Sequence, residues 1–100
     1  MENEITLSSE ELIHYVRNDV EVYDILEISY NRIFLPAEVI DIEHEIDEND
    51  VERLNVVLQI KGELLNDTIH LDLIEIKEDI IEVRHINKAE ELVVIVVEDT

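Results

Sequence analysis

Hydrophobic and polar residues alternate along several stretches of the chain, which is the pattern of strands with one buried face. The clearest stretch is residues 40–47, where one register is almost wholly apolar and the other wholly carboxylate. The apolar register holds Ile40, Ile42, His44 and Ile46, and the carboxylate register holds Asp41, Glu43, Glu45 and Asp47. We predict a half-buried strand with an acidic outer face, followed by a turn at residues 48–50.

Three further stretches predict strands. Residues 54–61 alternate in the same way, and Asn66-Asp67 indicates the turn that follows. Residues 69–73 alternate until the pattern changes phase at Ile74, which predicts a β-bulge near Leu73. Residues 81–83 form another short strand after an acidic corner.

Residues 92–97 differ from these because they are apolar in both registers. Such a segment is typical of a central strand, or of a strand that pairs with a second copy across a dimer. The predicted oligomer contact in the second case consists of Val93, Val94, Ile95 and Val96.

A helix is predicted near the start of the chain. Ser8 or Ser9 can cap it, and the apolar residues that follow lie on one helical stripe: Leu12, Ile13, Val16 and Val20. Residues 20–30 fit a helix or a strand, and we favour a strand from Ile25 to a turn at Asn31-Arg32. We expect Pro36 to interrupt regular secondary structure after that turn.

These elements predict one α+β domain over residues 1–100, with an N-terminal helix and about five or six mainly antiparallel strands. The 28 Val and Ile residues favour strands, because β-branched side chains suit a pleated sheet. A β-sandwich is the alternative arrangement.

The net charge narrows the possible partners. The chain carries 27 acidic and 7 basic residues, a formal charge of −20. Direct binding to nucleic acid or to an anionic membrane is excluded, because both attract basic surfaces. No apolar stretch approaches the roughly 20 residues of a membrane span, and the acidic start is unlike a signal peptide. We expect a soluble, cytoplasmic protein.

The sequence offers little catalytic chemistry, and we expect no enzyme, cofactor or metal. Cysteine is absent, and the four histidines fit no metal-binding spacing. Glu75-Ile76-Lys77 resembles the acid-x-Lys string of restriction-type nucleases, but a nuclease must approach a polyanion. Residues 47–50 are rich in oxygen ligands, yet they lack the glycine of an EF-hand loop.

The remaining candidate is the acidic surface. Eight carboxylates fall within fifteen residues that contain no Lys or Arg: Glu38, Asp41, Glu43, Glu45, Asp47, Glu48, Asp50 and Glu52. On a strand, side chains i and i+2 lie roughly 6.6 Å apart, which is close to the spacing of phosphates along one strand of a duplex. A charge of −20 also exceeds the roughly 2 to 8 units that a small domain needs for solubility.

In size and charge the chain resembles the acidic DNA-mimic inhibitors encoded by phages and mobile elements. The resemblance implies a protein that blocks a basic nucleic-acid-binding protein, as in anti-restriction or anti-CRISPR activity. We expect the eight carboxylates to form the contact face. The alternative is a small homo-oligomeric β domain, possible as a homodimer, that serves as an antitoxin or immunity protein. A halophilic or merely soluble domain also fits the charge.

Overall fold

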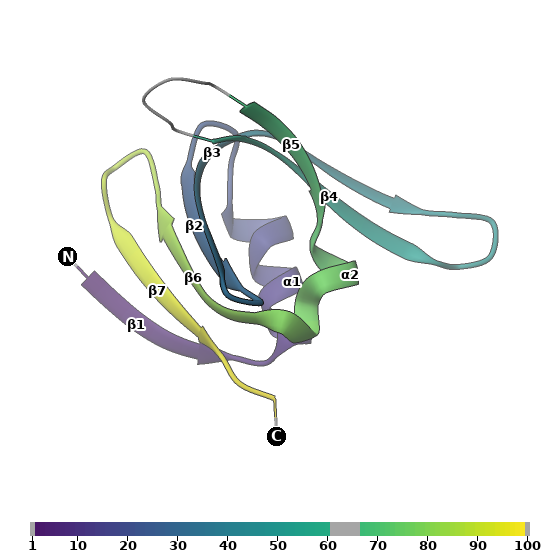
Figure 1. Cartoon of the computed structure of the whole chain (residues 1–100), viewed down its shortest axis with the longest axis horizontal. Coiled ribbons are helices and arrows are strands. Elements are labelled where there is room, and N and C mark those ends of the chain that lie inside the picture. The colour runs from purple at the N-terminus through teal and green to yellow at the C-terminus, as the bar shows by residue number, and fades with distance from the viewer. Residues whose placement is uncertain (1, 61–66, 100) are drawn as a thin grey trace.

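The computed structural model describes residues 2–60 and 67–99, and in this part of the chain seven strands form one mixed sheet (Figure 1). The strand order is β1-β7-β6-β2-β3-β4-β5. The strands are β1 (Glu2–Leu7), β2 (Ile25–Tyr30), β3 (Ile33–Ile46), β4 (Glu52–Ile60), β5 (Asp67–Asp72), β6 (Ile80–Ile86) and β7 (Leu92–Val97). The helices are α1 (Ser9–Asp19), α2 (Leu73–Ile76) and a 3₁₀ turn, η1 (Lys77–Asp79).

The predicted α+β class is therefore confirmed. All neighbouring strands are antiparallel except β1 and β7, which are parallel. The sandwich alternative is wrong, because the seven strands belong to one open sheet. No helix in the described part of the chain is long and apolar enough to cross a membrane.

Helix α1 begins where the sequence predicts. The Ser8 hydroxyl oxygen accepts a hydrogen bond from the Glu11 backbone N–H at 3.1 Å, and the Glu11 carboxylate accepts one from the Ser8 N–H at 3.0 Å. This reciprocal capping box satisfies two N–H groups that have no partner within the helix. The predicted stripe of Leu12, Ile13, Val16 and Val20 is buried against the sheet.

One hydrophobic core lies between the sheet and its two helices. We call the sheet face that carries this core the inner face, and the opposite one the outer face. Leu12 and Val16 of α1, Leu73 of α2 and inner-face residues of five strands belong to the same buried cluster. Both helices therefore cover the inner face, and in the described residues no helix covers the outer face.

Strand β7 is an interior strand, the first of the two alternatives for residues 92–97. It pairs with β1 on one side and β6 on the other. Val93 packs against the core, Val94 and Ile95 are buried on opposite faces, and Val96 is half-buried on the outer face. The backbone groups of these four residues are therefore used within the chain. Strand β1 itself was not predicted, because it offers only Ile5 and Leu7 as an apolar register.

Strand β3 is longer than predicted and runs through Pro36, so the predicted interruption is wrong. Pro36 pairs with Glu27 of β2, and the described pairing of β3 with β4 runs from Ala37 to Ile46. A register shift between Val39 and Asp41 then changes the phase. Ile40 is the extra residue at this bulge, so it does not share the inner register of Ile42.

The predicted bulge near Leu73 is also wrong, because β5 ends at Asp72 and helix α2 begins there. The Asp72 carboxylate accepts a hydrogen bond from the Ile74 N–H at 3.0 Å and so caps α2. The change of phase at Ile74 marks a change from strand to helix. Strand β6 is longer than the predicted residues 81–83. Two predicted positions, Lys61 and Asn66, lie outside the described residues.

Candidate partner-binding site

The β3–β4 hairpin projects from the body of the sheet. Strand β2 pairs with β3 only as far as Glu38, and β5 pairs with β4 only from Asn55 onward. Beyond these points the hairpin is a two-stranded ribbon, which extends away from the helices in Figure 1. We call residues 41–54 the distal hairpin.

Four of the eight predicted carboxylates share the outer face of β3. Glu38 faces outward because its neighbours Ala37 and Val39 are buried on the inner face. After the bulge, Ile42 packs on the core, so Asp41, Glu43 and Glu45 face outward too. The bulge thus keeps Glu38 in line with the other three. We call Glu38, Asp41, Glu43 and Glu45 the acidic row.

The acidic row has almost no compensating partners. In the described residues none of its carboxylates forms an ion pair. The Asp41 side chain accepts a hydrogen bond from the backbone N–H of Ile42 at 2.9 Å. Arg53 is the cross-strand neighbour of Glu45, but the two side chains do not form a salt bridge. The row therefore presents carboxylates that are free to bind cationic groups.

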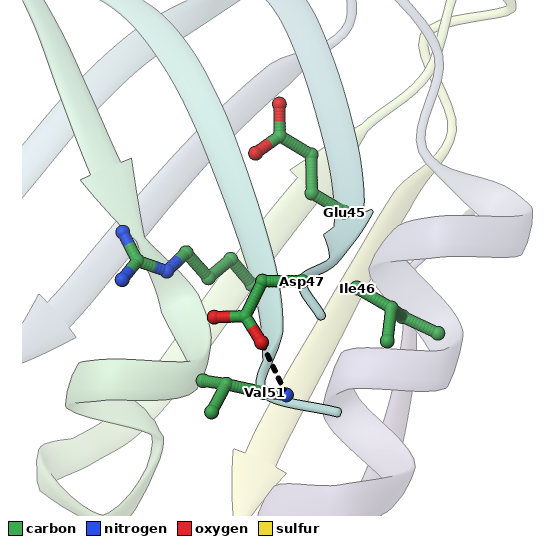
Figure 2. A pocket seen from close by; sticks show the side chains of 5 residues that line it. Glu45, Ile46, Asp47 and Val51 are labelled. Atoms are coloured by element: carbon green, nitrogen blue, oxygen red, sulfur yellow. Dashed lines mark hydrogen bonds between the residues drawn. The ribbon is translucent and has the colours of Figure 1, made fainter. Parts of the chain in front are cut away.

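Asp47 has a different role, because its carboxylate holds the hairpin loop. One oxygen accepts hydrogen bonds from the N–H groups of Asn49 at 2.8 Å and Val51 at 3.0 Å. The N–H groups of Val51 and then Asn49 lower the pKa of Asp47 below its ordinary value, with a smaller contribution from the positive charge of Arg53. In Figure 2 the Asp47 carboxylate turns toward Val51, while the Glu45 carboxylate points elsewhere.

The other three predicted carboxylates lie off the row. Glu48 and Asp50 are exposed in the loop at the hairpin tip, where Asp50 adopts a positive φ of 61°. Glu52 lies on the opposite face and contacts His44 at 3.4 Å, Oε2 to Nε2. His44 has the inner-face register that the alternation predicts, but it is exposed. The predicted half-buried strand is thus exposed on both faces beyond Ile42, because the ribbon extends past the helices.

The hollow at the hairpin tip has a volume of about 510 Å³. Glu45, Ile46, Asp47, Val51 and Arg53 line it (Figure 2). Its carboxylates do not converge on one point, and Asp47 already binds backbone N–H groups. In the described residues no group of three or more His, Asp or Glu side chains is arranged to hold a metal ion.

The acid-x-Lys string lies outside the hairpin, in α2 and η1. Lys77 forms an ion pair with Glu10 of α1. The hydrogen bond from this ammonium to the Glu10 carboxylate raises the pKa of Lys77, against a smaller opposing effect of burial. Lys77 therefore connects η1 to α1, and its ammonium group is already engaged.

A buried polar network was missed by the sequence analysis. Tyr15 Oη lies 2.7 Å from His85 Nδ1, and His85 Nε2 lies 2.7 Å from Asp24 Oδ2. Asp24 and His85 are almost fully buried, and Asp24 Oδ2 also accepts a hydrogen bond from the Glu21 N–H at 3.0 Å. Burial raises the pKa of Tyr15, and the negative charges of Asp19 and Asp24 raise it further.

Both ring nitrogens of His85 are occupied, so the imidazole has no free nitrogen to bind a metal or accept a substrate proton. The arrangement connects α1, the loop before β2, and β6 through side chains. The inner-face position of His85 beside Val83 was the available signal. Its partners are 61 and 70 residues away in sequence, and no local pattern reveals them.

Comparison with known proteins gives a family and no further relatives. A family model described as "Uncharacterized protein conserved in archaea (DUF2097)" matches residues 3–96. No curated protein and no solved structure matches the chain.

Proposed function

The chain belongs to the DUF2097 family, and from its own surface we propose that it binds a basic, nucleic-acid-binding protein and competes with nucleic acid for that protein. The acidic row supports this proposal most directly. Its four carboxylates lie on one face of a projecting hairpin, and in the described residues they form no ion pairs.

The spacing of the row fits a groove that binds phosphates. Glu43 lies between Asp41 and Glu45 in one register of a regular strand, with a repeat of roughly 6.6 Å. A strand holds the backbone of these residues at fixed positions, so little backbone freedom is lost on binding. Cationic side chains that contact successive phosphates can therefore contact successive carboxylates of the row.

A merely solubilising surface explains the row less well. Uncompensated like charges on neighbouring positions destabilise a folded domain by repulsion. Among the described basic residues, Arg53 is the cross-strand neighbour of Glu45, and it forms no salt bridge with it. Selection for binding to a basic partner explains why this destabilising repulsion is retained, whereas solubility alone requires far less charge.

The proposal places the protein in the cytoplasm with its partner. Inhibition of a restriction or CRISPR nuclease is one form of the activity, and sequestration of a cellular nucleic-acid-binding protein is another. Because the family is described as conserved in archaea, we favour the cellular partner. The antitoxin alternative relied on strand β7 as an assembly contact, and this strand is already paired on both sides.

The direct test is capture from an archaeal lysate that has been treated with nuclease. The immobilised chain should retain a nucleic-acid-binding protein at low salt and release it at high salt or on addition of duplex DNA or structured RNA. Recovery of one dedicated small toxin would support the antitoxin alternative. If no nucleic-acid-binding protein is retained, or if nucleic acid does not displace it, the proposed competition is wrong.

A further inference from the structure

One edge of the distal hairpin has no neighbouring strand within the described residues. Strand β2 pairs with β3 as far as Glu38, and the loop before β2 adds two backbone hydrogen bonds to Val39. The Val39 N–H donates to the Asp24 C=O at 2.8 Å, and the Val39 C=O accepts from the Tyr23 N–H at 2.7 Å. Beyond this point the ribbon extends past β2, and in the described residues β4 is the one backbone neighbour of residues 41–46 (Figure 1). We call the side of residues 41–46 that faces away from β4 the free β3 edge.

The backbone groups that reach this edge follow from the geometry of an antiparallel pair. Residues that direct their N–H and C=O groups at the partner strand alternate with residues that direct them away. The Asp47 N–H donates to the Val51 C=O at 3.0 Å, so every second residue before Asp47 also faces β4. The residues between them direct their backbone groups toward the free β3 edge, and these are Ile42, His44 and Ile46.

Two further hydrogen bonds agree with this direction. The Ile42 N–H donates to its neighbour Asp41 through the side-chain oxygen Oδ1, at 2.9 Å, and not to β4. Leu54, the cross-strand neighbour of His44, donates its N–H to Asp72 Oδ1 at 3.4 Å, away from β3. Because residues opposite each other direct their backbone groups in the same way, those of His44 face away from β4. Apart from the Ile42 N–H, the backbone groups of the free β3 edge are thus available to an added strand.

A hollow of about 480 Å³ adjoins the free β3 edge. It lies between the end of α1 with its following loop and the first residues of the edge, and its lining includes Asn18, Val20, Val22, Asp41, Ile42 and His44. Asp41 faces the outer side of β3 and Ile42 the inner side, so the hollow is at the edge and not over one face. It leaves room for an added backbone at the end of the edge nearest the body of the sheet.

The side chains along the edge select one kind of occupant. On the outer face an added strand would lie beside Asp41, Glu43 and Glu45, and opposite charges on neighbouring strands attract whereas like charges repel. A second copy that paired through the same edge would bring two acidic rows side by side, so these carboxylates oppose self-association. Lys or Arg side chains would complement the row. On the inner face the neighbours Ile42 and Ile46 favour apolar side chains.

We propose that the free β3 edge accepts an extended segment of the partner protein as an added antiparallel strand, with Lys or Arg in one register and apolar side chains in the other. Backbone hydrogen bonds then supply affinity, and the alternating side chains supply specificity. Antiparallel pairing is also the arrangement of β3 with both of its own neighbours. The inference rests on the proposed function for the charge of the partner, and it specifies the form in which the partner contacts the acidic row.

The test compares two methylated forms of one fluorescent peptide, with the full chain as the receptor. The parent peptide has about seven residues, in which Lys and Val alternate. When it pairs antiparallel with its Lys side chains beside the acidic row, the Val N–H groups face β3 and the Lys N–H groups face solvent. One form is N-methylated at the Val residues and the other at the same number of Lys residues. The two forms therefore have the same charge and composition and differ only in which N–H groups are removed.

Fluorescence anisotropy at low salt should show that the Val-methylated peptide binds about tenfold or more weakly than the Lys-methylated one, because only the former loses its hydrogen bonds to β3. The Lys-methylated peptide should also slow amide hydrogen exchange at His44 and Ile46. Equal affinities would overturn the added strand, because charge alone would then hold the peptide. Slower exchange only in β1 or β5, the outermost strands of the sheet, would also overturn it, since the site would then be another edge.

The remaining outcomes separate this inference from the proposed function. A wild-type dimer in sedimentation that the peptide dissociates would overturn the added strand of a partner, because the occupant would then be a second copy. If the two peptides bind equally while a nucleic-acid-binding protein is still captured, the proposed function stands and the free β3 edge is not its contact. If no such protein is captured while the chain still discriminates between the peptides, the proposed function is wrong and the free β3 edge remains a binding site for basic strands.

Discussion

At the scale of single residues, the buried network of Tyr15, His85 and Asp24 has a large expected effect on stability. Asp24 is 2% exposed and His85 is 3% exposed, so neither can exchange its partner for water. Replacing one member of a buried hydrogen-bonded pair leaves the polar atom of the other without a partner, which costs more than removing both.

We predict that His85→Phe lowers the free energy of unfolding by about 3–5 kcal/mol, because it leaves the Asp24 carboxylate buried without its main hydrogen-bond donor. Adding Asp24→Asn to this variant should recover part of the loss, since the neutral amide is cheaper to bury and its oxygen still accepts from the Glu21 N–H. Urea unfolding of the single and double variants measures this. A double variant less stable than His85→Phe alone would contradict the account.

The same network predicts that the free energy of unfolding decreases at alkaline pH. The pKa of Tyr15 is raised above its ordinary value of 10.0 in the folded protein, so the unfolded chain loses this proton first as the pH rises. The contribution of Tyr15 to stability is therefore complete below about pH 10 and declines above it. Tyr15→Phe should show a shallower decline than the wild type when unfolding free energies are compared from neutral to alkaline pH. Parallel curves would show that the phenol does not ionise differently in the two states.

At the scale of elements, the β3–β4 loop over residues 47–51 and the β6–β7 loop over residues 87–91 have the same construction. Asn87 Oδ1 accepts hydrogen bonds from the Ala89 and Glu91 N–H groups at 2.9 and 3.0 Å, as Asp47 does from the residues two and four positions later. Glu90 and Asp50 each adopt a φ of 61°. Each loop is thus closed by a side-chain oxygen and a residue in the left-handed region.

This equivalence predicts that Asp47→Asn is well tolerated, whereas Asp47→Ala destabilises the distal hairpin. Asparagine keeps the oxygen that accepts from Asn49 and Val51, and alanine removes it. Amide hydrogen exchange of Val51 is the measurement, because exchange should accelerate in the alanine variant only. Because the fold lowers the pKa of Asp47, its ionised carboxylate stabilises the folded protein at pH values above the ordinary carboxyl pKa. This stabilisation is lost as the pH falls through the lowered pKa. The Asp47→Asn variant should not show this acid-dependent loss of stability.

Elements with a strong local signal could be predicted from the sequence. An N-cap serine and the apolar stripe that follows it identified α1, and the alternation of residues 40–47 identified the second half of β3. Strand β1 was missed because its stability comes from pairing with β7, more than 80 residues away, a contact that alternation over Ile5 and Leu7 does not reveal. Helix α2 was read as a bulge because four residues are too few to show a helical period.

The placement of the candidate carboxylates could be predicted in part for the same reason. Period-two spacing correctly grouped Asp41, Glu43 and Glu45 on one face, and the bulge at Ile40 brings Glu38 into line. Spacing alone did not reveal that Asp47 is held by the loop or that Glu52 lies on the opposite face beside His44. Both facts depend on the geometry of the turn and on the partner strand.

At the scale of the whole molecule, the charge is organised by the topology. One face of the sheet is covered by helices, and the opposite face presents the acidic row. Partner binding through the row should weaken steeply as ionic strength rises, because exposed charges are screened over roughly 8–10 Å at physiological salt.

The most direct measurement is the affinity of the captured partner for two variants that each lose four charges. One variant neutralises the acidic row through Glu38→Gln, Asp41→Asn, Glu43→Gln and Glu45→Gln, and leaves Asp47 to hold the loop. The other neutralises exposed carboxylates elsewhere through Glu78→Gln, Asp79→Asn, Glu90→Gln and Glu91→Gln. Affinities are measured by calorimetry at low and physiological salt.

We predict that the row variant keeps or gains stability, because repulsion falls, and loses affinity by orders of magnitude at low salt. The control variant should stay within about tenfold of the wild type, since its charges act only at long range. Equal losses in the two variants would mean that only the net charge matters, and this result would contradict a phosphate-like row on β3.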